Sequence, residues 1–301
     1  SARGNCGLPE PQAQLRRFPL KNLVLRTLTF VIMVPLLFSL IVFLPQRDHL
    51  ALAIVAILAC GVAATEIYDI MSERIGRGTA QKLATPFIGM IMPAVALLEV
   101  QRILPDSASI LILTFSAAVI LAAQSFRRNE ESFEQVLPNV SGNLLLLIYP
   151  GVFAAYVIRM GGLPYSEVLI VAFLAAVYFN DTAAYLAGMA LGRFSPNPVA
   201  VSPNKSLIGF IGGFLTSPLV MWLASVLFPA AFPSGIWAIL GLGAAVGVAT
   251  ILGDLAESAL KRAVTAKDSG AIIPGRGGLL DSIDSVLLAA PVFFYLYTVL
   301  F

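Results

Sequence analysis

Two aspartates, Asp281 and Asp284, stand three positions apart, directly before an apolar run that starts at Val286. On a helix this spacing puts both carboxylates on one face, where they repel each other unless a cation lies between them. Mg²⁺ suits such a pair, because it prefers oxygen ligands and is often held by one or two carboxylates together with substrate phosphates. Asp254 is a third carboxylate that we expect to converge there. The alternative is a pair of solvated aspartates at a helix N-terminus.

A second group of charged residues comes before this pair. A helical interpretation of residues 250–285 places Asp254, Ser258 and Lys261 on one face, with Glu257 beside it. The face begins where an apolar stretch ends, and ionisable residues at membrane depth are candidates for function. A structural ion pair is the other interpretation.

The next segment is rich in glycine. Lys267 and Asp268 are followed by the sequence Pro-Gly-Arg-Gly-Gly at 274–278. Glycines let backbone amides approach an anion closely, although Pro-Gly and Gly-Gly also mark ordinary turns. The position of this segment between two charged helix ends favours anion binding.

Further candidates lie upstream. Asp181 follows the apolar run 168–179, and the loop after that helix carries Ser202 and Lys205. Lys205 precedes a predicted helix that starts at Leu207, where an ammonium group and helix N-terminal amides are able to bind one anion.

The balance of charges indicates the class of reaction. Carboxylates for Mg²⁺ and several cations suit a polyphosphate substrate; the cations are Lys205, Lys261, Arg262, Lys267 and Arg276. With one histidine and two cysteines in the chain, no pattern of a covalent nucleophile is present. Phosphoryl and nucleotidyl transfer depend mainly on positioning and charge neutralisation. Because apolar segments surround these residues, a lipid phosphate is a candidate substrate.

These residues together resemble the signature of the phosphatidate cytidylyltransferases, also called CDP-diglyceride synthases. The resemblance covers roughly residues 180–285, whereas residues 1–179 agree only in being hydrophobic. The motifs that carry it are Asn180-Asp181-Thr182-x-Ala184-Tyr185, Ser202-Pro203-x-Lys205-Ser206-x-x-Gly209, Gly253-Asp254-x-x-Glu257-Ser258-x-x-Lys261-Arg262, Lys267-Asp268-x-Gly270, Pro274-Gly275-x-Gly277-Gly278 and Asp281-x-x-Asp284.

The resemblance implies that CTP and phosphatidic acid give CDP-diacylglycerol and pyrophosphate, with Mg²⁺ and optionally a second cation as cofactors. It also implies a homodimer among membrane lipids, with the site in a cytoplasm-facing cavity and no nucleic acid partner. The expected catalytic residues are Asp254, Asp281, Asp284, Lys267 and Asp268. The expected metal ligands are Asp254, Asp281 and Asp284. The expected substrate-binding residues are Asp181, Ser202, Lys205, Ser258, Lys261, Arg262, Gly275, Arg276, Gly277 and Gly278.

Three positions depart from the family pattern. Arg276 stands where the family usually has histidine, Ser282 where it has arginine, and Ile208 where it has glutamate. Arg276 keeps the anion-binding character of its position. Two other functions remain open at this point: a CTP-dependent enzyme acting on another lipid or polyprenol phosphate, and a transporter-like or inactive homologue.

The composition indicates the kind of fold that positions these residues. Of 301 residues, 58% are hydrophobic and 12% charged, against about 25% charged in a typical soluble domain. Soluble enzymes, disordered scaffolds and disulfide-rich secreted modules are therefore excluded. The chain is predicted to be an all-α polytopic membrane protein with about nine transmembrane helices, since each needs about 20 apolar residues. The predicted segments are 22–44, 50–68, 83–100, 108–124, 140–158, 166–187, 207–228, 234–252 and 285–301.

The chain is divided into a polar N-terminal leader (1–21), N-terminal transmembrane helices (22–179) and a C-terminal catalytic region (180–301), the last two forming one integrated membrane domain. Most lysines and arginines between the segments fall on the side of the N-terminus. Because positive loops stay in the cytoplasm, the N-terminus and the site are predicted to face the cytoplasm.

Overall fold

A computed structural model describes residues 20–75, 79–126, 130–273 and 277–301 of the chain. The described residues form helices and no strand, which confirms the all-α prediction. The elements are α1 (Leu20–Phe43), α2 (Gln46–Ile75), α3 (Thr79–Val100), α4 (Ala108–Ala122), η1 (Ala123–Phe126), η2 (Glu130–Gln135), α5 (Val136–Leu146), η3 (Leu147–Val152), α6 (Phe153–Met160), α7 (Ser166–Leu191), η4 (Gly192–Phe194), α8 (Leu207–Leu227), η5 (Pro229–Ala231), α9 (Ile236–Ala263) and α10 (Leu280–Leu300).

Eight helical stretches among the described residues are long and apolar enough to cross a membrane, and α1 adds the shorter apolar stretch Ile32–Phe43. Each of the nine predicted segments corresponds to one of these. The segment 140–158 is a composite of α5, η3 and α6. Its middle, η3, is a π-helix that contains Pro150. A proline has no N–H to donate, so it interrupts the regular α-helical hydrogen bonds at this point.

The main differences from the predicted boundaries lie around the charged residues. Helix α9 runs to Ala263 and α10 begins at Leu280, so both helices extend beyond their apolar runs. The helical interpretation of 250–285 is confirmed for 250–263 and 280–285 and is wrong between them, where the described residues from 264 to 279 form a connecting loop with one isolated bridge, between Ile273 and Gly277. Gly270, Pro274 and Gly277 disfavour a continuous helix there.

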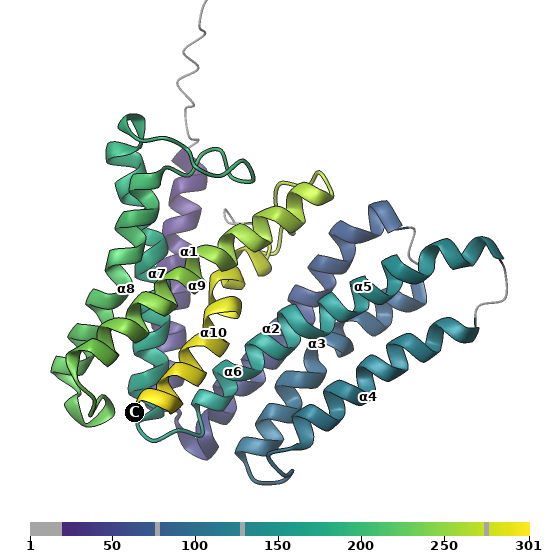
Figure 1. Cartoon of the computed structure of the whole chain (residues 1–301), viewed down its shortest axis with the longest axis horizontal. Coiled ribbons are helices and arrows are strands. Elements are labelled where there is room, and N and C mark those ends of the chain that lie inside the picture. Colours follow the sequence, from purple (N-terminus) through teal and green to yellow (C-terminus); the bar gives the residue numbers. More distant parts are fainter. Residues whose placement is uncertain (1–19, 76–78, 127–129, 274–276) are drawn as a thin grey trace, which may run out of the picture.

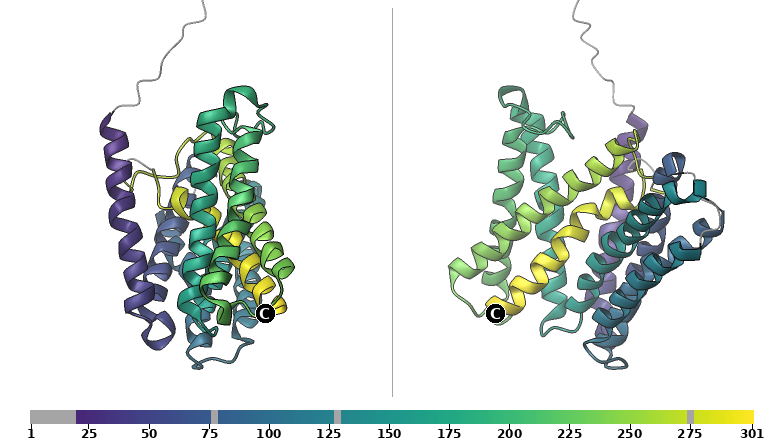
Figure 2. Two further views of the ribbon diagram at one scale, coloured as in Figure 1. Left: turned by 90° about the vertical axis from the view of Figure 1, so that its left-hand side faces the viewer. Right: turned by 45° about the vertical axis from the view of Figure 1, so that its right-hand side comes forward.

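The helices pack in two groups that share α10. In the first group α7 packs along α8, α8 against α9, and α9 against α10; in the second, α2 and α6 both pack against α3. Helix α10 contacts α9 on one side and α6 on the other, an arrangement visible in Figures 1 and 2. Phe173 of α7, Leu242 of α9 and Phe293 of α10 are fully buried in the largest core cluster.

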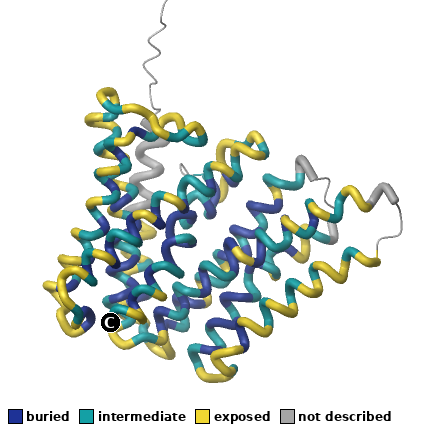
Figure 3. Tube along the Cα trace, in the orientation of Figure 1, coloured by how far each residue is buried: buried dark blue, intermediate teal, exposed yellow. Residues whose placement is uncertain are grey.

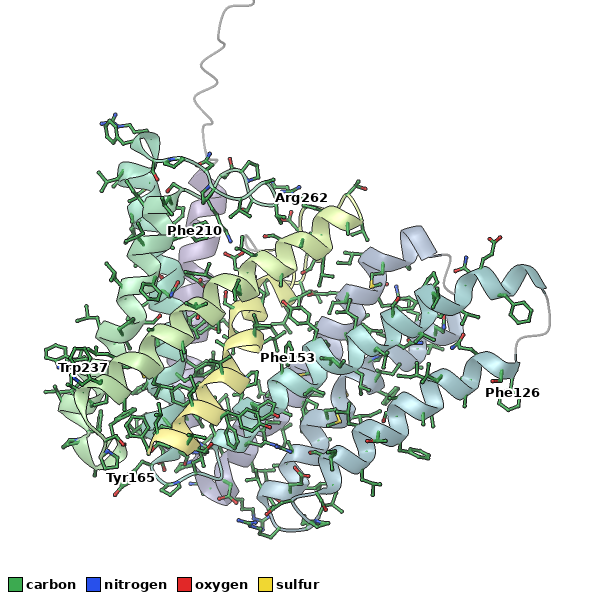
Figure 4. The ribbon with its side chains drawn as sticks, in the orientation of Figure 1. Phe126, Phe153, Tyr165, Phe210, Trp237 and Arg262 are labelled. Atoms are coloured by element: carbon green, nitrogen blue, oxygen red, sulfur yellow. The ribbon has the colours of Figure 1, made fainter. Side chains whose placement is uncertain are left out.

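The outer surface fits a lipid environment. Buried segments line the middle of the bundle, while α4 is mostly exposed or half-buried (Figure 3). Helix α4 is strongly apolar, and its side chains Ile110, Leu111 and Phe115 are exposed on the outer surface. Exposed apolar side chains are expected of a helix that faces lipid. Figure 4 shows Trp237 and Tyr165 at the end opposite Arg262, and aromatic residues are typical of the membrane interface.

Candidate active site

The candidate residues gather at one end of the bundle because four helix ends meet there. The end of α7, the start of α8, the end of α9 and the start of α10 lie on the same side of the molecule (Figure 1). Helix α9 has 28 residues, about eight more than a membrane crossing needs. Its last turns therefore carry charged residues to the membrane boundary.

The first part of the site is an open cavity of about 490 Å³ between α7, α8 and α9, whose lining includes Asp181, Lys205 and Asp254. Lys205 and Asp254 form an ion pair across it, with side chains 27% and 34% exposed. Helix α8 begins at Leu207, as predicted, and the hydroxyl of Ser206 caps it by accepting from the Gly209 amide at 3.2 Å. Lys205 thus stands immediately before a capped helix N-terminus.

Asn180 fixes the position of its neighbour Asp181. The buried Asn180 amide nitrogen donates to the Ser217 hydroxyl at 3.0 Å and to the Gly247 carbonyl at 3.4 Å. A Cβ at Gly213 would lie 2.6 Å from Asn180 Oδ1, so only glycine lets α8 approach α7 this closely. One polar side chain in the lining of the cavity therefore joins α7, α8 and α9.

The second part of the site centres on Lys261. Its ammonium group lies 2.5 Å from Glu257 Oε2 and 2.6 Å from Asp281 Oδ1, and all three side chains are largely buried. The other oxygen of Asp281 accepts the backbone amides of Ser269 at 3.0 Å and Gly278 at 2.7 Å. Asp281 is therefore bound both to a cation from α9 and to amides of the connecting loop.

Asp284 has different surroundings from Asp281. It is 7% exposed and its Oδ1 accepts from the Ser285 amide at 2.7 Å. The carboxylates of Asp254 and Asp181 act on it electrostatically, so three negative groups from α7, α9 and α10 lie within range of one another. No group of three acidic, histidine or cysteine side chains in the described part of the chain is arranged around one metal position.

Even so, the donor set fits a divalent cation. Several buried polar atoms at this end have no hydrogen-bond partner within the described protein: Tyr149 Oη, Asn180 Oδ1, Glu257 Oε1, Ser282 Oγ and Ser285 Oγ. Buried polar atoms are normally paired with protein, water or an ion. Oxygen atoms in excess beside clustered carboxylates match the preference of Mg²⁺ for oxygen ligands.

The remaining predicted residues are less enclosed. Arg262, Lys267 and Asp268 are exposed, whereas Ser202 and Ser258 are half-buried. The Ser202 carbonyl accepts from the Lys205 amide at 3.1 Å, forming the turn that leads to α8. Gly275 and Arg276 lie outside the described residues.

Gly277 and Gly278 have local structural reasons to be glycine. Gly277 has a φ of +112°, a conformation in which side chains are strained. The Gly278 amide donates to Asp281, and a Cβ at Gly278 would lie 2.0 Å from the Ser269 hydroxyl. The loop amides seen here therefore bind a carboxylate of the protein itself.

Sequence reasoning missed two residues of this region. Glu66 of α2 is 5% exposed and accepts hydrogen bonds from the connecting loop and from the start of α10. Tyr149 of η3 is also 5% exposed, and the carboxylates of Asp284, Glu257 and Asp254 act on its hydroxyl. The available signal for Glu66 was an ionisable residue within the apolar segment 50–68; Tyr149 gave none.

A helical membrane bundle with clustered carboxylates and lysines at one end is the scaffold of a membrane enzyme for phosphate chemistry. The chain belongs to the cytidylyltransferase family, whose model matches residues 24–300. A phosphatidate cytidylyltransferase of Staphylococcus aureus (strain COL) is 34% identical over 271 residues, which are 89% of this chain and 96% of that protein.

Two further relatives match over shorter stretches. The phosphatidate cytidylyltransferase of Staphylococcus haemolyticus is 41% identical over 140 residues, 46% of this chain and 50% of that protein. The Escherichia coli (strain K12) protein YnbB, which bears no functional name, is 41% identical over 130 residues, 43% of this chain and 42% of that protein. The full-length match to the Staphylococcus aureus protein shows that the likeness extends well beyond the C-terminal motifs.

Proposed function

We propose that this protein transfers CMP from CTP to phosphatidic acid, giving CDP-diacylglycerol and pyrophosphate for phospholipid biosynthesis. The observation that carries the proposal is the 34% identity to phosphatidate cytidylyltransferase over nearly the whole of both chains. The site supports it, because a largely buried lysine and several carboxylates stand at one end of a bundle that exposes many apolar side chains.

The reaction is a nucleotidyl transfer. A phosphate oxygen of phosphatidic acid forms a bond to the α-phosphorus of CTP while the bond from that phosphorus to the bridging oxygen breaks, and pyrophosphate leaves with the electron pair. No protein nucleophile is required. Lys205 at the open cavity and Lys261 beside Asp281 are placed to offset the charge that develops on the leaving pyrophosphate.

Mg²⁺, with an optional second cation, is part of the proposal. Asp254, Asp281 and Asp284 are the proposed ligands, and a bound cation would neutralise the phosphate charge. Arg262, Lys267, Asp268 and Ser258 stay proposed contacts of the substrates at the rim. The start of α1 and the site lie on the same side of the bundle (Figure 2). We propose that this is the cytoplasmic side, where CTP is available. A homodimer is proposed on the family resemblance.

The test is a transfer assay on the purified protein in detergent with phosphatidic acid, α-labelled CTP and Mg²⁺. We expect labelled lipid and pyrophosphate in equal amounts, and loss of both in Asp284→Asn. Gly241→Ala is the matched control, because nothing lies within 4 Å of a Cβ at Gly241.

Other outcomes would redirect the assignment. If labelled lipid forms only with a polyprenol phosphate, the acceptor substrate is a polyprenol phosphate and not phosphatidic acid. Release of CDP without pyrophosphate would indicate phosphoryl transfer by a kinase. A folded protein that binds no CTP would overturn the enzymatic proposal.

A further inference from the structure

Glu66 belongs to the first half of the chain, and its carboxylate contacts the connecting loop and the start of α10. It lies on α2 between the buried residues Ala63 and Ile67, and its side chain is enclosed by protein. Its hydrogen-bond partners lie more than 200 positions away, in the connecting loop and at the start of α10. The link between α2 and the site is therefore purely tertiary.

The contacts of Glu66 cap helix α10. Its Oε1 accepts the Leu279 amide and its Oε2 accepts the Leu280 amide, both at 2.8 Å. The residue at the N-cap position of α10, Leu279, has no side chain able to do this. Amides of a first helical turn have no partner within the helix, and a carboxylate is a favourable acceptor there.

Two loop glycines make room for the Glu66 carboxylate. A Cβ at Gly270 would lie 2.8 Å from Oε1 and a Cβ at Gly278 would lie 2.6 Å from Oε2. Real Cβ atoms do not approach this closely, so the glycines follow from the close packing of the loop around Glu66. The carboxylate is thus enclosed by the loop and the helix start on several sides.

Ser269 joins Glu66 to the predicted catalytic residue Asp281. Its hydroxyl donates to Glu66 Oε2 at 3.3 Å, while its backbone amide donates to Asp281 Oδ2 at 3.0 Å. The amide of Gly278, which packs against Glu66, donates to the same Asp281 oxygen. Glu66 and Asp281 therefore both bind this loop, and Ser269 contacts both of them.

We propose that Glu66 is a positioning residue for CMP transfer, which fixes the loop at Ser269 and Leu279 and the first turn of α10 so that Asp281 is held in place for the substrates. This inference rests on the proposed function. A carboxylate that orients another ligand or catalytic group by hydrogen bonds commonly changes activity by about 10- to 100-fold when it is altered.

The test compares Glu66→Gln with Glu99→Gln. Glu99 is the matched control, because it is equally buried but binds Ser109 and Arg159 at the opposite end of the bundle. For Glu66→Gln we expect kcat to fall by about tenfold or more while KM for CTP changes less, because binding groups remain but the reacting geometry is lost. Glu99→Gln should keep kcat, whatever its Tm.

Amide hydrogen exchange measures the fixation of the loop without any activity. In Glu66→Gln the amides of residues 269 and 278–282 should exchange faster than in the wild type, and in Glu99→Gln they should not. A milder variant, Ser269→Ala, should lower kcat in the same direction, and the double variant with Glu66→Gln should lose less than the product of the two single effects.

Unchanged exchange at residues 269 and 278–282 in folded Glu66→Gln would overturn the inference, and so would faster exchange with an unchanged kcat. If the wild type itself transfers no CMP, the proposed function fails, and with it the role in catalysis. The exchange result would then show separately whether Glu66 holds the loop.

Discussion

Glu99 and Glu66 are buried at opposite ends of the membrane bundle, and their charges are balanced differently. At the end away from the site, Glu99 accepts from the Ser109 amide at 2.6 Å, the Ser109 hydroxyl at 2.8 Å and the Arg159 guanidinium at 2.6 Å. At the site end, Glu66 accepts from two backbone amides and a hydroxyl, all of them neutral donors.

This difference distinguishes the structural ion pair of Glu99 and Arg159 from the carboxylate cluster at the candidate active site. Glu99 and Arg159 join the ends of α3 and α6 and compensate each other, as a buried pair must to be tolerated. At the other end Asp181, Asp254 and Asp284 lie within electrostatic range of each other, and several neighbouring oxygens have no partner. We propose that this concentration of carboxylates helps to bind a cation.

The largest effect is expected from Asp281→Asn. The neutral amide weakens the contacts with Lys261 and with the loop amides of Ser269 and Gly278. CMP transfer should fall by about a hundredfold or more, the scale seen when one group that stabilises the transition state is removed. Steady-state kinetics of the purified variant measures this, and retention of more than a tenth of the activity would remove Asp281 from the catalytic group.

Lys205→Ala should have a smaller effect, because this lysine is more exposed than Lys261. The change leaves Asp254 without its partner across the open cavity. We expect kcat/KM for CTP to fall by about tenfold. The same measurement on Lys205→Arg tests whether a positive charge at this position is enough. Equal kcat/KM of the Lys205→Ala and Lys205→Arg variants would mean that the phosphates of CTP do not bind at Lys205.

Arg159→Ala should affect stability and leave the chemistry intact. It removes the cation from Glu99, whose side chain is 6% exposed, and loss of one partner of a buried pair costs about 3 kcal/mol. Thermal unfolding in detergent should show a lower Tm, while kcat per folded molecule stays at the wild-type value. A loss of kcat without a loss of Tm would mean that the two ends of the bundle are coupled.

The smallest effect is expected from Tyr156→Phe. The Tyr156 and Tyr295 hydroxyls lie 2.6 Å apart on the exposed side of α6 and α10, and the ring beneath the Arg159 guanidinium is retained. Loss of a single exposed hydrogen bond costs at most about 1 kcal/mol. Tm should change little and activity should not change, which makes this variant a sensitive control for Arg159→Ala.

Much of the fold could be predicted from the sequence, because a membrane-spanning segment has to be both helical and apolar. A backbone in the membrane satisfies its hydrogen bonds within helices, so apolar length alone indicated each of the nine spans. The start of α8 was also predictable, since Ser206 is a local cap. The break between α9 and α10 was not, because the charged turns on either side of it are held by tertiary contacts with Lys205, Lys261 and Glu66.

The candidate site divides in the same way. Residue type and spacing along the sequence identified Asp181, Lys205, Asp254, Lys261, Asp281 and Asp284 as the charged candidates. Their pairing was decided only in three dimensions: Asp254 binds Lys205, and Asp281 binds Lys261 together with loop amides. Glu66 and Tyr149 joined them from helices far away in the sequence. Sequence determines which charges are present and where helices cross the membrane, whereas packing determines which of those charges pair with each other.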